Sequence, residues 1–327
     1  MRDPAGIAAA IQAAESVCVC GHVNPDGDAV GSALAMRLIL MGMGKKVRVF
    51  FQDKIPDYLS FLTGVDDIRK PETNTERYDL FLALDSSEAI RMGACVQLMK
   101  CCTRTAQIDH HGTNPGYADV NSIDADASAT STLIREQMAA LGAPMTKEIA
   151  ECLYAGISTD TGNFSFDCTD AETFRVMGDL VEAGLPLTEL NMRLFREKSM
   201  PQLKLLGRAI EKMHYEENGR ISVMTLTEQD FRECGALAEH ADMIVNYGLE
   251  TIGTKMAMLA RESNDGKIKF SLRARAPWTV DDVASRLGGG GHARAAGINM
   301  DGTLESTVPL VLAAMTEKLR NEAEGQE

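Results

Sequence analysis

The chain has 327 residues, of which 45% are hydrophobic and 24% are charged. This length exceeds that of one typical domain, and the composition is ordinary for a globular protein, so we expect two domains, each with a hydrophobic core. The formal net charge of −14 at pH 7 argues against a general binder of duplex DNA, but it leaves small nucleotides open because a small site needs only local positive charge.

The cysteines and the N-terminal segment predict the cellular location. The segment "MRDPAGIAAAIQAAESV" lacks the basic start and apolar core of a signal peptide, and no run approaches the roughly 18 apolar residues of a membrane span. The eight cysteines are scattered without a CxxC pair, and most lie in or beside apolar segments. Such cysteines are typical of buried side chains in a reduced protein. We therefore expect a cytoplasmic protein that has no membrane partner.

The first half of the chain alternates strand-like and helical patterns, which predicts a mostly parallel sheet covered by helices. The predicted strands are Ser16–Gly21, Lys46–Phe51, Tyr78–Leu84 and Thr103–Ile108. The predicted helices are Asp28–Met41, Ser128–Leu141 and Lys147–Ile157. Continuous apolar runs such as "DLFLAL" fit strands that are buried on both faces.

The second half begins with a helix that Asp170 caps and Gly184 stops, and helical patterns continue to about His214. From Arg220 the pattern changes to strands in "RISVMTL", "TKMAMLARE" and "KIKFSLRARA", followed by a helix in "TVDDVASRL". The tail "EKLRNEAEGQE" fits a frayed helix end. We predict an N-terminal domain over residues 1–190, a helical linker over 191–218 and a smaller α/β domain over 219–327.

Acidic turns follow four apolar segments of the first domain, where an open α/β sheet collects its ligands. These turns contain His22, Asp26, Asp28, Asp85, Asp109, His110, His111 and Asp160. One such Asp is usually a cap or turn residue, and one such His is usually structural. However, carboxylates crowded on one rim would repel one another and shift each other's pKa. A pair of divalent cations among them removes that problem.

Histidine and carboxylate ligands without cysteine favour a borderline-hard cation. Mn²⁺ fits best, Mg²⁺, Co²⁺ and Fe²⁺ are alternatives, and a structural Zn²⁺ is disfavoured. Two such ions about 3.5–4 Å apart suit phosphoester hydrolysis, because they lower the pKa of a bound water and neutralise charge on the phosphoryl oxygens. We expect His22 and Asp26 to face one ion and Asp28 to face the other.

Five motifs resemble those of one known family. In order, "GHVNPDGDAVGS", "LDSSE", "DHHGTN" and "GISTDTGNF" resemble the N-terminal motifs of the DHH phosphoesterase superfamily, and "GGGGHARAAG" resembles the signature of its DHHA1 domain. The resemblance spans nearly the whole chain and is strongest to the oligoribonuclease and pAp-phosphatase group. It implies a DHH catalytic domain with a smaller α/β DHHA1 domain and the active site in the cleft between them.

The same resemblance implies a role for each site residue. One metal ion would be held by His22, Asp26 and Asp85, and the other by Asp28, His110, Asp160 and a bridging Asp85. His111 would lie beside the scissile phosphate, and Asp109 would bond a ligand imidazole and fix its tautomer. Asn24 and Asn114 match the pattern and would refine the site, Asn114 as a substrate contact. The stretch "DASATSTLIREQM" stands where relatives read closer to "ASSTAE", which leaves the substrate preference open.

The second domain carries a glycine run inside a basic segment. Between Lys255 and Arg294, eight Lys and Arg residues stand against four acidic residues. Arg273 and Arg275 precede four successive glycines, which can turn their N–H groups toward an anion, and a tight turn alone rarely needs four. The expected substrate-binding residues of this domain are Arg273, Gly289, Gly290, Gly291 and His292.

These observations favour a phosphohydrolase with two Mn²⁺ that trims short RNA oligonucleotides to mononucleotides and converts 3′-phosphoadenosine 5′-phosphate (pAp) to AMP. One alternative is a phosphodiesterase for linear or cyclic dinucleotides such as pApA and cyclic di-AMP. An inorganic pyrophosphatase is disfavoured because it should lack the GGGGH segment. A nucleotide sensor without catalysis is the alternative from another class, and the presence of all six expected metal ligands argues against it. The physiological substrate, the trimming direction, the cellular metal and the oligomeric state, including a homodimer, stay open.

Overall fold

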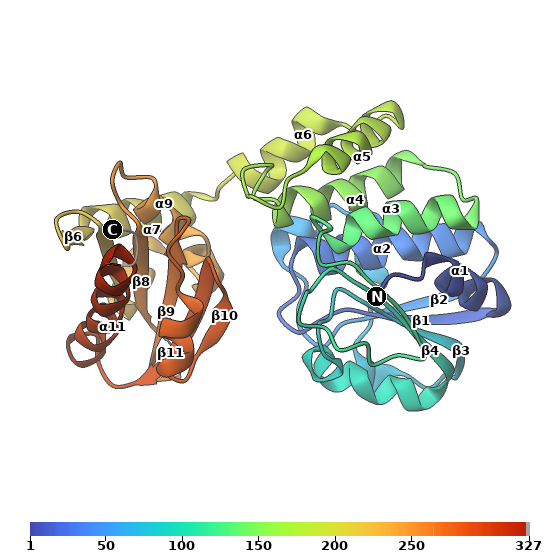
Figure 1. Cartoon of the computed structure of the whole chain (residues 1–327), viewed down its shortest axis with the longest axis horizontal. Helices are drawn as coiled ribbons and strands as arrows, with labels where there is room; N and C mark the ends of the chain where they lie inside the picture. The colour runs from blue at the N-terminus through green and yellow to red at the C-terminus, as the bar shows by residue number, and fades with distance from the viewer. Residues whose placement is uncertain (264, 325–327) are drawn as a thin grey trace. The chain divides into compact units, whose positions relative to one another are not determined.

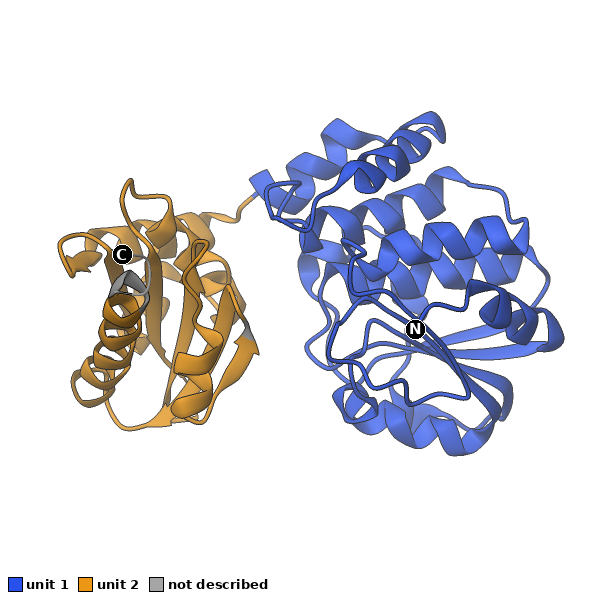
Figure 2. Cartoon of the chain, viewed as in Figure 1, with its two compact units in different colours: residues 1–197 blue, residues 198–327 orange. Residues whose placement is uncertain are grey.

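The chain folds into two compact units, each built around its own sheet (Figure 1). The computed structural model describes residues 1–263 and 265–324. The first unit comprises residues 1–197 and the second residues 198–327 (Figure 2). The predicted class, a parallel α/β domain followed by a smaller α/β domain, is confirmed. The assignment of residues 191–218 to a linker and the placement of the active site between the domains stay predictions.

The sheet of the first unit has five parallel strands in the order β2-β1-β3-β4-β5. The strands are β1 (Ser16–Cys20), β2 (Lys46–Phe50), β3 (Tyr78–Leu84), β4 (Cys102–Asp109) and β5 (Val120–Ile123). The first four are the predicted strands, within one residue at each end. The sequence pattern missed β5, because "VNSI" is short and half polar. Buried side chains along β1 alternate between two hydrophobic clusters, one on each face of the sheet, which explains the continuous apolar runs.

Helices cover both faces of this sheet, with α2, α3 and α4 together on one face (Figure 1). The α-helices are α1 (Pro4–Ala13), α2 (Gly27–Gly42), α3 (Thr130–Leu141), α4 (Lys147–Asp160), α5 (Ala171–Glu182) and α6 (Leu187–Asn191). The other helical segments, which are not α-helices, are η1 (Asp57–Leu59), η2 (Val65–Asp67), η3 (Pro71–Thr73), η4 (Ala89–Cys101) and η5 (Met192–Arg196), of which η4 packs on the opposite face. The predicted helices correspond to α2, α3 and α4, and Asp170 caps α5 as expected.

Glycines let α2 and α4 approach each other closely. A Cβ atom on Gly31 would lie 2.4 Å from the backbone oxygen of Cys152. A Cβ atom on Gly156 would lie 2.0 Å from the hydroxyl of Ser131 and 2.7 Å from a carboxylate oxygen of Asp28. Only hydrogen fits at both glycines. This packing brings the start of α2 next to the end of α4.

The second unit contains a six-stranded mixed sheet, whose strands are in the order β10-β11-β9-β8-β7-β6. Its strands are β6 (His214–Glu216), β7 (Ile221–Leu226), β8 (Met256–Glu262), β9 (Lys267–Ala274), β10 (Gly290–His292) and β11 (Ala295–Asp301). Its helices are α7 (Met200–Glu211), α8 (Glu228–Cys234), η6 (Ala238–Ala241), α9 (Ile244–Leu249), α10 (Asp281–Arg286) and α11 (Leu304–Glu324). The three strands and the helix predicted from residue 220 onward are present. The predicted C-terminal helix end belongs to α11, and its last three residues lie outside the described part.

Two expectations about location and cysteines can be compared with the structure. Among the residues described, none of the helices combines the length and apolar character needed to cross a lipid bilayer. All eight cysteines are free thiols, as predicted. Cys101 and Cys102 are only partly buried and Cys168 is exposed, so burial does not hold for every cysteine.

Candidate metal centre

The parallel sheet brings the predicted acidic turns to one edge. Strands β1, β3 and β4 are neighbours in the sheet and run in the same direction, so their carboxyl ends share an edge. His22 follows β1, Asp85 follows β3, and His110 follows β4 directly. Asp28 lies in the first turn of α2, and Asp160 is the last residue of α4. All six expected metal ligands therefore come together, from five segments of the chain.

The first group of ligand atoms joins His22, Asp26 and Asp85, all within 4.8 Å of one another. The Nε2 atom of His22 lies 3.4 Å from Asp85 and 3.6 Å from Asp26. The other ring nitrogen, Nδ1, lies 2.8 Å from the backbone oxygen of Val23, which orients the ring so that Nε2 faces the carboxylates. One oxygen of Asp26 caps α2 through two backbone N–H groups, at 3.0 and 3.1 Å. Its other oxygen faces His22.

The second group joins Asp28, His110 and Asp160, again within 4.8 Å. The Nε2 atom of His110 lies 3.3 Å from Asp160 and 3.6 Å from Asp85. Its Nδ1 atom lies 3.3 Å from the backbone oxygen of Ala127, so this ring also turns Nε2 toward the carboxylates. Both ligand imidazoles are thus oriented by backbone carbonyls.

Asp85 faces both groups. One of its oxygens is near His22 and the other is near His110, so the same carboxylate can bridge two ions. The residue is 2% exposed and has a left-handed backbone, with φ of +54°, which is uncommon for a residue other than glycine. Its backbone N–H donates to Ile108 (3.1 Å), and its carboxylate accepts from the hydroxyl of Thr130 (3.0 Å).

The start of α3 holds the buried carboxylate of Asp28, a role that sequence reasoning missed. The backbone N–H groups of Thr130 (2.5 Å) and Ser131 (2.9 Å) donate to the two oxygens of Asp28. The N-cap residue of α3, Ala129, offers no side-chain cap of its own. Asp28 therefore caps a helix that begins 102 residues later, so no local pattern signals the pair. Part of the stretch that departs from the family pattern therefore positions two candidate metal ligands, Asp28 and Asp85.

Asp109 bonds a different imidazole from the one expected. One of its oxygens lies 2.8 Å from Nδ1 of His111, whereas the two presumptive ligand histidines bond backbone carbonyls. Its other oxygen accepts from the side-chain amide of Asn114 at 2.6 Å. Asn114 also contacts Gln107 (3.1 Å) and the backbone of Ser86 (3.2 Å). The contacts of Asn114 thus orient Asp109, which in turn orients His111.

The electrostatics of the cluster reflect its crowding. Burial and the nearby Asp85 raise the pKa of Asp28 to about 6. Burial, together with Asp28 and Asp85, raises the pKa of Asp160 well above its usual range. Burial opposes the charged form of His22, but hydrogen bonds with Asp26 and Asp85 outweigh it and raise the pKa of this imidazole to about 11. Without cations, protons would have to compensate the carboxylates.

The donor set fits divalent cations of the predicted kind. Each candidate metal group in the described part of the chain consists of Asp and His alone. Carboxylate and imidazole suit Mn²⁺ and its neighbours, and carboxylate also suits Mg²⁺. Cations placed among these groups would take over the charge compensation that protons provide.

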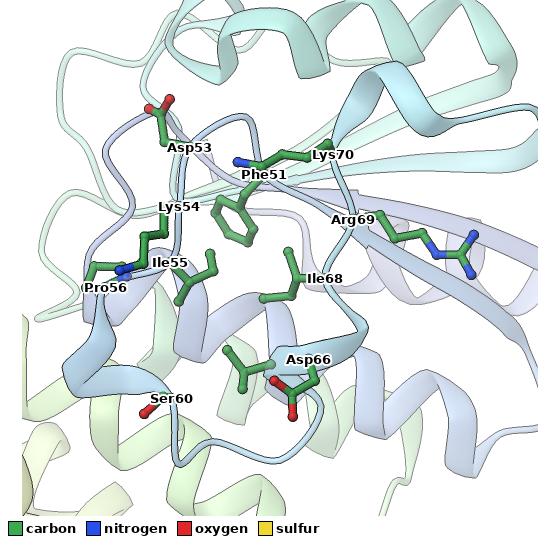
Figure 3. Close-up of a pocket in the computed structure, with 11 residues that line it drawn as sticks. Phe51, Asp53, Lys54, Ile55, Pro56, Ser60, Asp66, Ile68, Arg69 and Lys70 are labelled. Carbon is green, nitrogen blue, oxygen red and sulfur yellow. The ribbon is translucent and has the colours of Figure 1, made fainter.

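A cavity of about 290 Å³ is lined by side chains from the segment between Phe51 and Lys70 (Figure 3). Its lining combines apolar side chains, such as Phe51, Ile55 and Ile68, with charged ones that include Asp53 and Lys70 (Figure 3). None of its lining residues belongs to the clustered carboxylates and imidazoles. Asp53 accepts a hydrogen bond from the backbone N–H of Asn24 (2.7 Å). This bond helps to hold the turn between His22 and Asp26, so the cavity adjoins that turn.

The glycine run has structural uses that the sequence argument overlooked. Gly288 ends α10 with φ of +79°, a Cβ atom on Gly289 would lie 2.1 Å from the backbone oxygen of Gly297, and Gly291 has φ of +149°. Three of the four glycines therefore have structural uses in this hairpin, and the expected anion-binding role of the run stays a prediction. At Gly290, by contrast, a Cβ atom would meet no described atom within 4 Å.

The basic residues near this run are placed differently from each other. Arg273 donates to the side chain of Asn246 (3.1 Å) and is partly buried, whereas Arg275 follows the end of β9 and donates to the backbone of Leu249 (3.0 Å). Burial lowers the pKa of Arg273, and Asp242 opposes this shift. The backbone of His292 pairs in β10, but its side chain lies outside the described residues.

Comparison with known proteins gives one consistent result for both units. The model of the DHH family, N-terminal domain, matches residues 16–157, and the DHHA1 domain model matches residues 219–321. The chain is 32% identical over 317 residues to the bifunctional oligoribonuclease and PAP phosphatase NrnA of Thermus thermophilus, covering 96% of this chain and 93% of that protein.

Solved structures share the fold. An exopolyphosphatase-related protein from Bacteroides fragilis is 24% identical, with a TM-score of 0.90 over 97% of this chain and 95% of that chain. RecJ from Thermus thermophilus, solved in complex with Mn²⁺, is 16% identical, with a TM-score of 0.53 over 98% of this chain and 54% of that chain.

Proposed function

The chain belongs to the DHH family of phosphoesterases and carries a DHHA1 domain, and on this premise we propose that it hydrolyses short oligoribonucleotides to mononucleotides and pAp to AMP. The relative at 32% identity, whose name states both activities, supports this choice of substrates. The observation that carries the proposal is the pair of adjacent ligand groups, of which one contains Asp85 and the other brings His110 to 3.6 Å from the same carboxylate. A long duplex is not an expected substrate, because the chain is acidic overall.

Two divalent cations, with Mn²⁺ as the first choice, are part of the proposal. His22, Asp26 and Asp85 would hold one cation, and Asp28, His110 and Asp160 would hold the other, with Asp85 between them. When bound, such a pair supplies an activated water and neutralises charge on the phosphoryl oxygens. The residues around the pair keep these ligands oriented: α3 holds Asp28, and the carbonyls of Val23 and Ala127 hold the imidazoles.

His111 is proposed as the group that protonates the leaving oxygen. Burial opposes its charged form, but the hydrogen bond to Asp109 raises the pKa of His111 above its ordinary value. With Nδ1 facing Asp109, the proton transferred is the one on Nε2. Asn114 donates to the far oxygen of Asp109 and so keeps this carboxylate turned toward the ring.

The second unit is proposed to bind the phosphate that is not cleaved. Arg273 and the N–H of Gly290 are the strongest of the expected contacts, because a guanidinium and an uncrowded glycine are both suited to an anion. Gly289 and Gly291 keep the hairpin backbone in place, and His292 keeps its predicted role as a phosphate contact.

The proposal is tested with a substrate panel in the presence of Mn²⁺. Purified protein is incubated with pAp, pApA, a three-nucleotide RNA and a DNA duplex, and release of phosphate or AMP is measured. We expect turnover of pAp and of the short RNA, and loss of activity in Asp85→Ala and His110→Ala, because each removes a ligand. Asp301→Ala and His214→Ala, which change exposed residues of the second unit, are the matched controls.

Two results would contradict the proposal. If no phosphoester in the panel is cleaved with Mn²⁺, Mg²⁺ or Co²⁺, a nucleotide sensor without catalysis is favoured. If pApA alone is cleaved, the enzyme is a dinucleotide phosphodiesterase. Circular dichroism of each variant checks that loss of activity does not come from unfolding.

A further inference from the structure

A tight turn with an exposed aromatic ring follows the last metal-ligand candidate. We call residues 161–166 the aromatic turn; they follow Asp160 directly. Phe166, at its end, is 54% exposed. Its ring lies over Gly162, because a Cβ atom built on that glycine would come within 2.4 Å of a ring carbon. Aromatic residues make up only 5% of this chain, and Phe166 is one of its exposed rings, six positions after Asp160.

The backbone of the aromatic turn is strained. Three successive residues, Gly162, Asn163 and Phe164, have left-handed conformations, with φ of +56°, +55° and +64°. Two of these three are not glycine, and Phe in this region is rare. Such strain persists only where surrounding contacts enforce it, and it concentrates at functional sites.

Hydrogen bonds hold the turn in this shape. The backbone N–H of Asn163 donates to Ser158 (2.6 Å), and the side chain of Asn191 donates to the side chain of Asn163 (3.0 Å). Thr161 accepts from Phe164 through its hydroxyl (3.1 Å) and from Phe166 through its carbonyl (3.0 Å). The position of the Phe166 backbone is therefore set by the fold before any ligand arrives.

The turn is tied to the metal centre by the residue that precedes it. Asp160 lies 3.3 Å from Nε2 of His110, and the aromatic turn begins at the next residue. A phosphate held at the second ligand group would carry its nucleoside on one side. A flat apolar ring such as that of Phe166 matches the face of a nucleobase.

We propose that Phe166 is a substrate-binding residue on which the nucleobase next to the cleaved phosphate stacks. This inference rests on the proposed function, since it assigns the base of that substrate. Stacking uses the π-face that every base has, so Phe166 provides affinity with little preference among bases. Such tolerance suits an enzyme that degrades RNA of any sequence.

The test removes either the ring or the base. Values of kcat and KM are measured with Mn²⁺ for pAp and for its abasic analogue, in which hydrogen replaces adenine. The proteins are the wild type, Phe166→Ala, Phe166→Trp and Met41→Ala. Met41 is the matched control, because it is 49% exposed and lies near the far end of α2.

We expect Phe166→Ala to raise KM for pAp about 5- to 150-fold, which corresponds to the stacking free energy of one base. KM for the abasic analogue should stay unchanged, and Phe166→Trp should keep the wild-type KM for pAp. The loss in Phe166→Ala should be similar for the uridine, cytidine and guanosine bisphosphates. Met41→Ala should behave as the wild type.

A binding measurement separates failure of this inference from failure of the proposed function. AMP and ribose 5-phosphate are titrated into each full-length protein by calorimetry, which needs no turnover. Preference for AMP that disappears in Phe166→Ala supports stacking even if no substrate is hydrolysed. The inference is overturned if Phe166→Ala weakens AMP and ribose 5-phosphate equally, or weakens neither.

Discussion

Two regions are conspicuous in the sequence: the sheet edge of the first unit that carries the six candidate metal ligands (the metal edge) and the hairpin of the second unit that begins with residues 288–291 (the glycine hairpin). Their residues have different roles in the structure. At the metal edge, carboxylates converge although they repel one another, and protein donors hold them there. In the hairpin, Gly288, Gly289 and Gly291 are used by the backbone itself. Crowded charge has no structural benefit of its own, whereas a glycine run often has one.

The difference shows which motif is stronger evidence for function. A buried carboxylate such as Asp28 costs folding free energy unless it is paired, and its pKa near 6 records that cost. Gly291, by contrast, adds no cost in folding free energy beyond that of an ordinary hairpin. The metal edge therefore carries the functional conclusion, and the hairpin supports it mainly through Gly290 and Arg273.

At a fixed pH, we expect the largest change in Mn²⁺ affinity when a hydrogen bond that orients a carboxylate of the metal edge is removed. Thr130→Val removes the hydroxyl that bonds Asp85 but keeps the backbone N–H that bonds Asp28. Loss of such a supporting contact typically lowers metal affinity about 10- to 100-fold, and we expect this for Mn²⁺ measured by calorimetry. Thr132→Val, whose hydroxyl bonds only the backbone of Ala129, is the control. Unchanged Mn²⁺ affinity in Thr130→Val would show that the hydroxyl of Thr130 does not support the metal edge through Asp85.

Two alanine substitutions divide the glycine hairpin into structural and binding positions. Gly291→Ala should lower the free energy of unfolding by about 1–3 kcal/mol, because its Cβ atom would lie 2.4 Å from the backbone oxygen of Ala295. Gly290→Ala has room for its methyl group and should leave stability nearly unchanged while raising KM for pAp. Urea denaturation and steady-state kinetics measure the two effects. Equal KM values for Gly290→Ala and the wild type would remove the hairpin from substrate binding.

The pH dependence of metal binding tests whether the protonated carboxyls of the metal edge are the groups that bind the cation. Since the pKa of Asp28 is raised to about 6 and that of Asp160 is also raised, both carboxyls hold protons in acid that Mn²⁺ must displace. Mn²⁺ affinity should therefore increase as the pH rises from 5 to 8, by up to about tenfold per unit for each proton released. Calorimetry in two buffers of different ionisation enthalpy counts these protons. Affinity that is independent of pH would mean that these carboxyls do not bind the metal.

Much of the first unit follows from local sequence patterns. Continuous apolar runs predicted β1 to β4, and the rule that parallel strands share one carboxyl edge predicted that His22, Asp85 and His110 would meet there. The same reasoning placed Asp26, Asp28 and Asp160 at this edge, and the motif resemblance assigned each residue to one of two ions. These predictions succeeded because strand period, helix caps and strand direction are properties of short segments.

Tertiary structure decided the contacts between distant segments. Three contacts join groups that no local pattern relates. They are the pairing of Asp28 with the start of α3, the bond from Asp109 to His111, and the close approach of Gly289 to the backbone oxygen of Gly297. The exposed ring of Phe166 depends in the same way on the turn that holds it. A sequence can reveal which residues end a strand, because strand ends depend on neighbouring residues in the chain. Each buried polar group needs a hydrogen bond, and the packing of the whole unit decides which group becomes its partner.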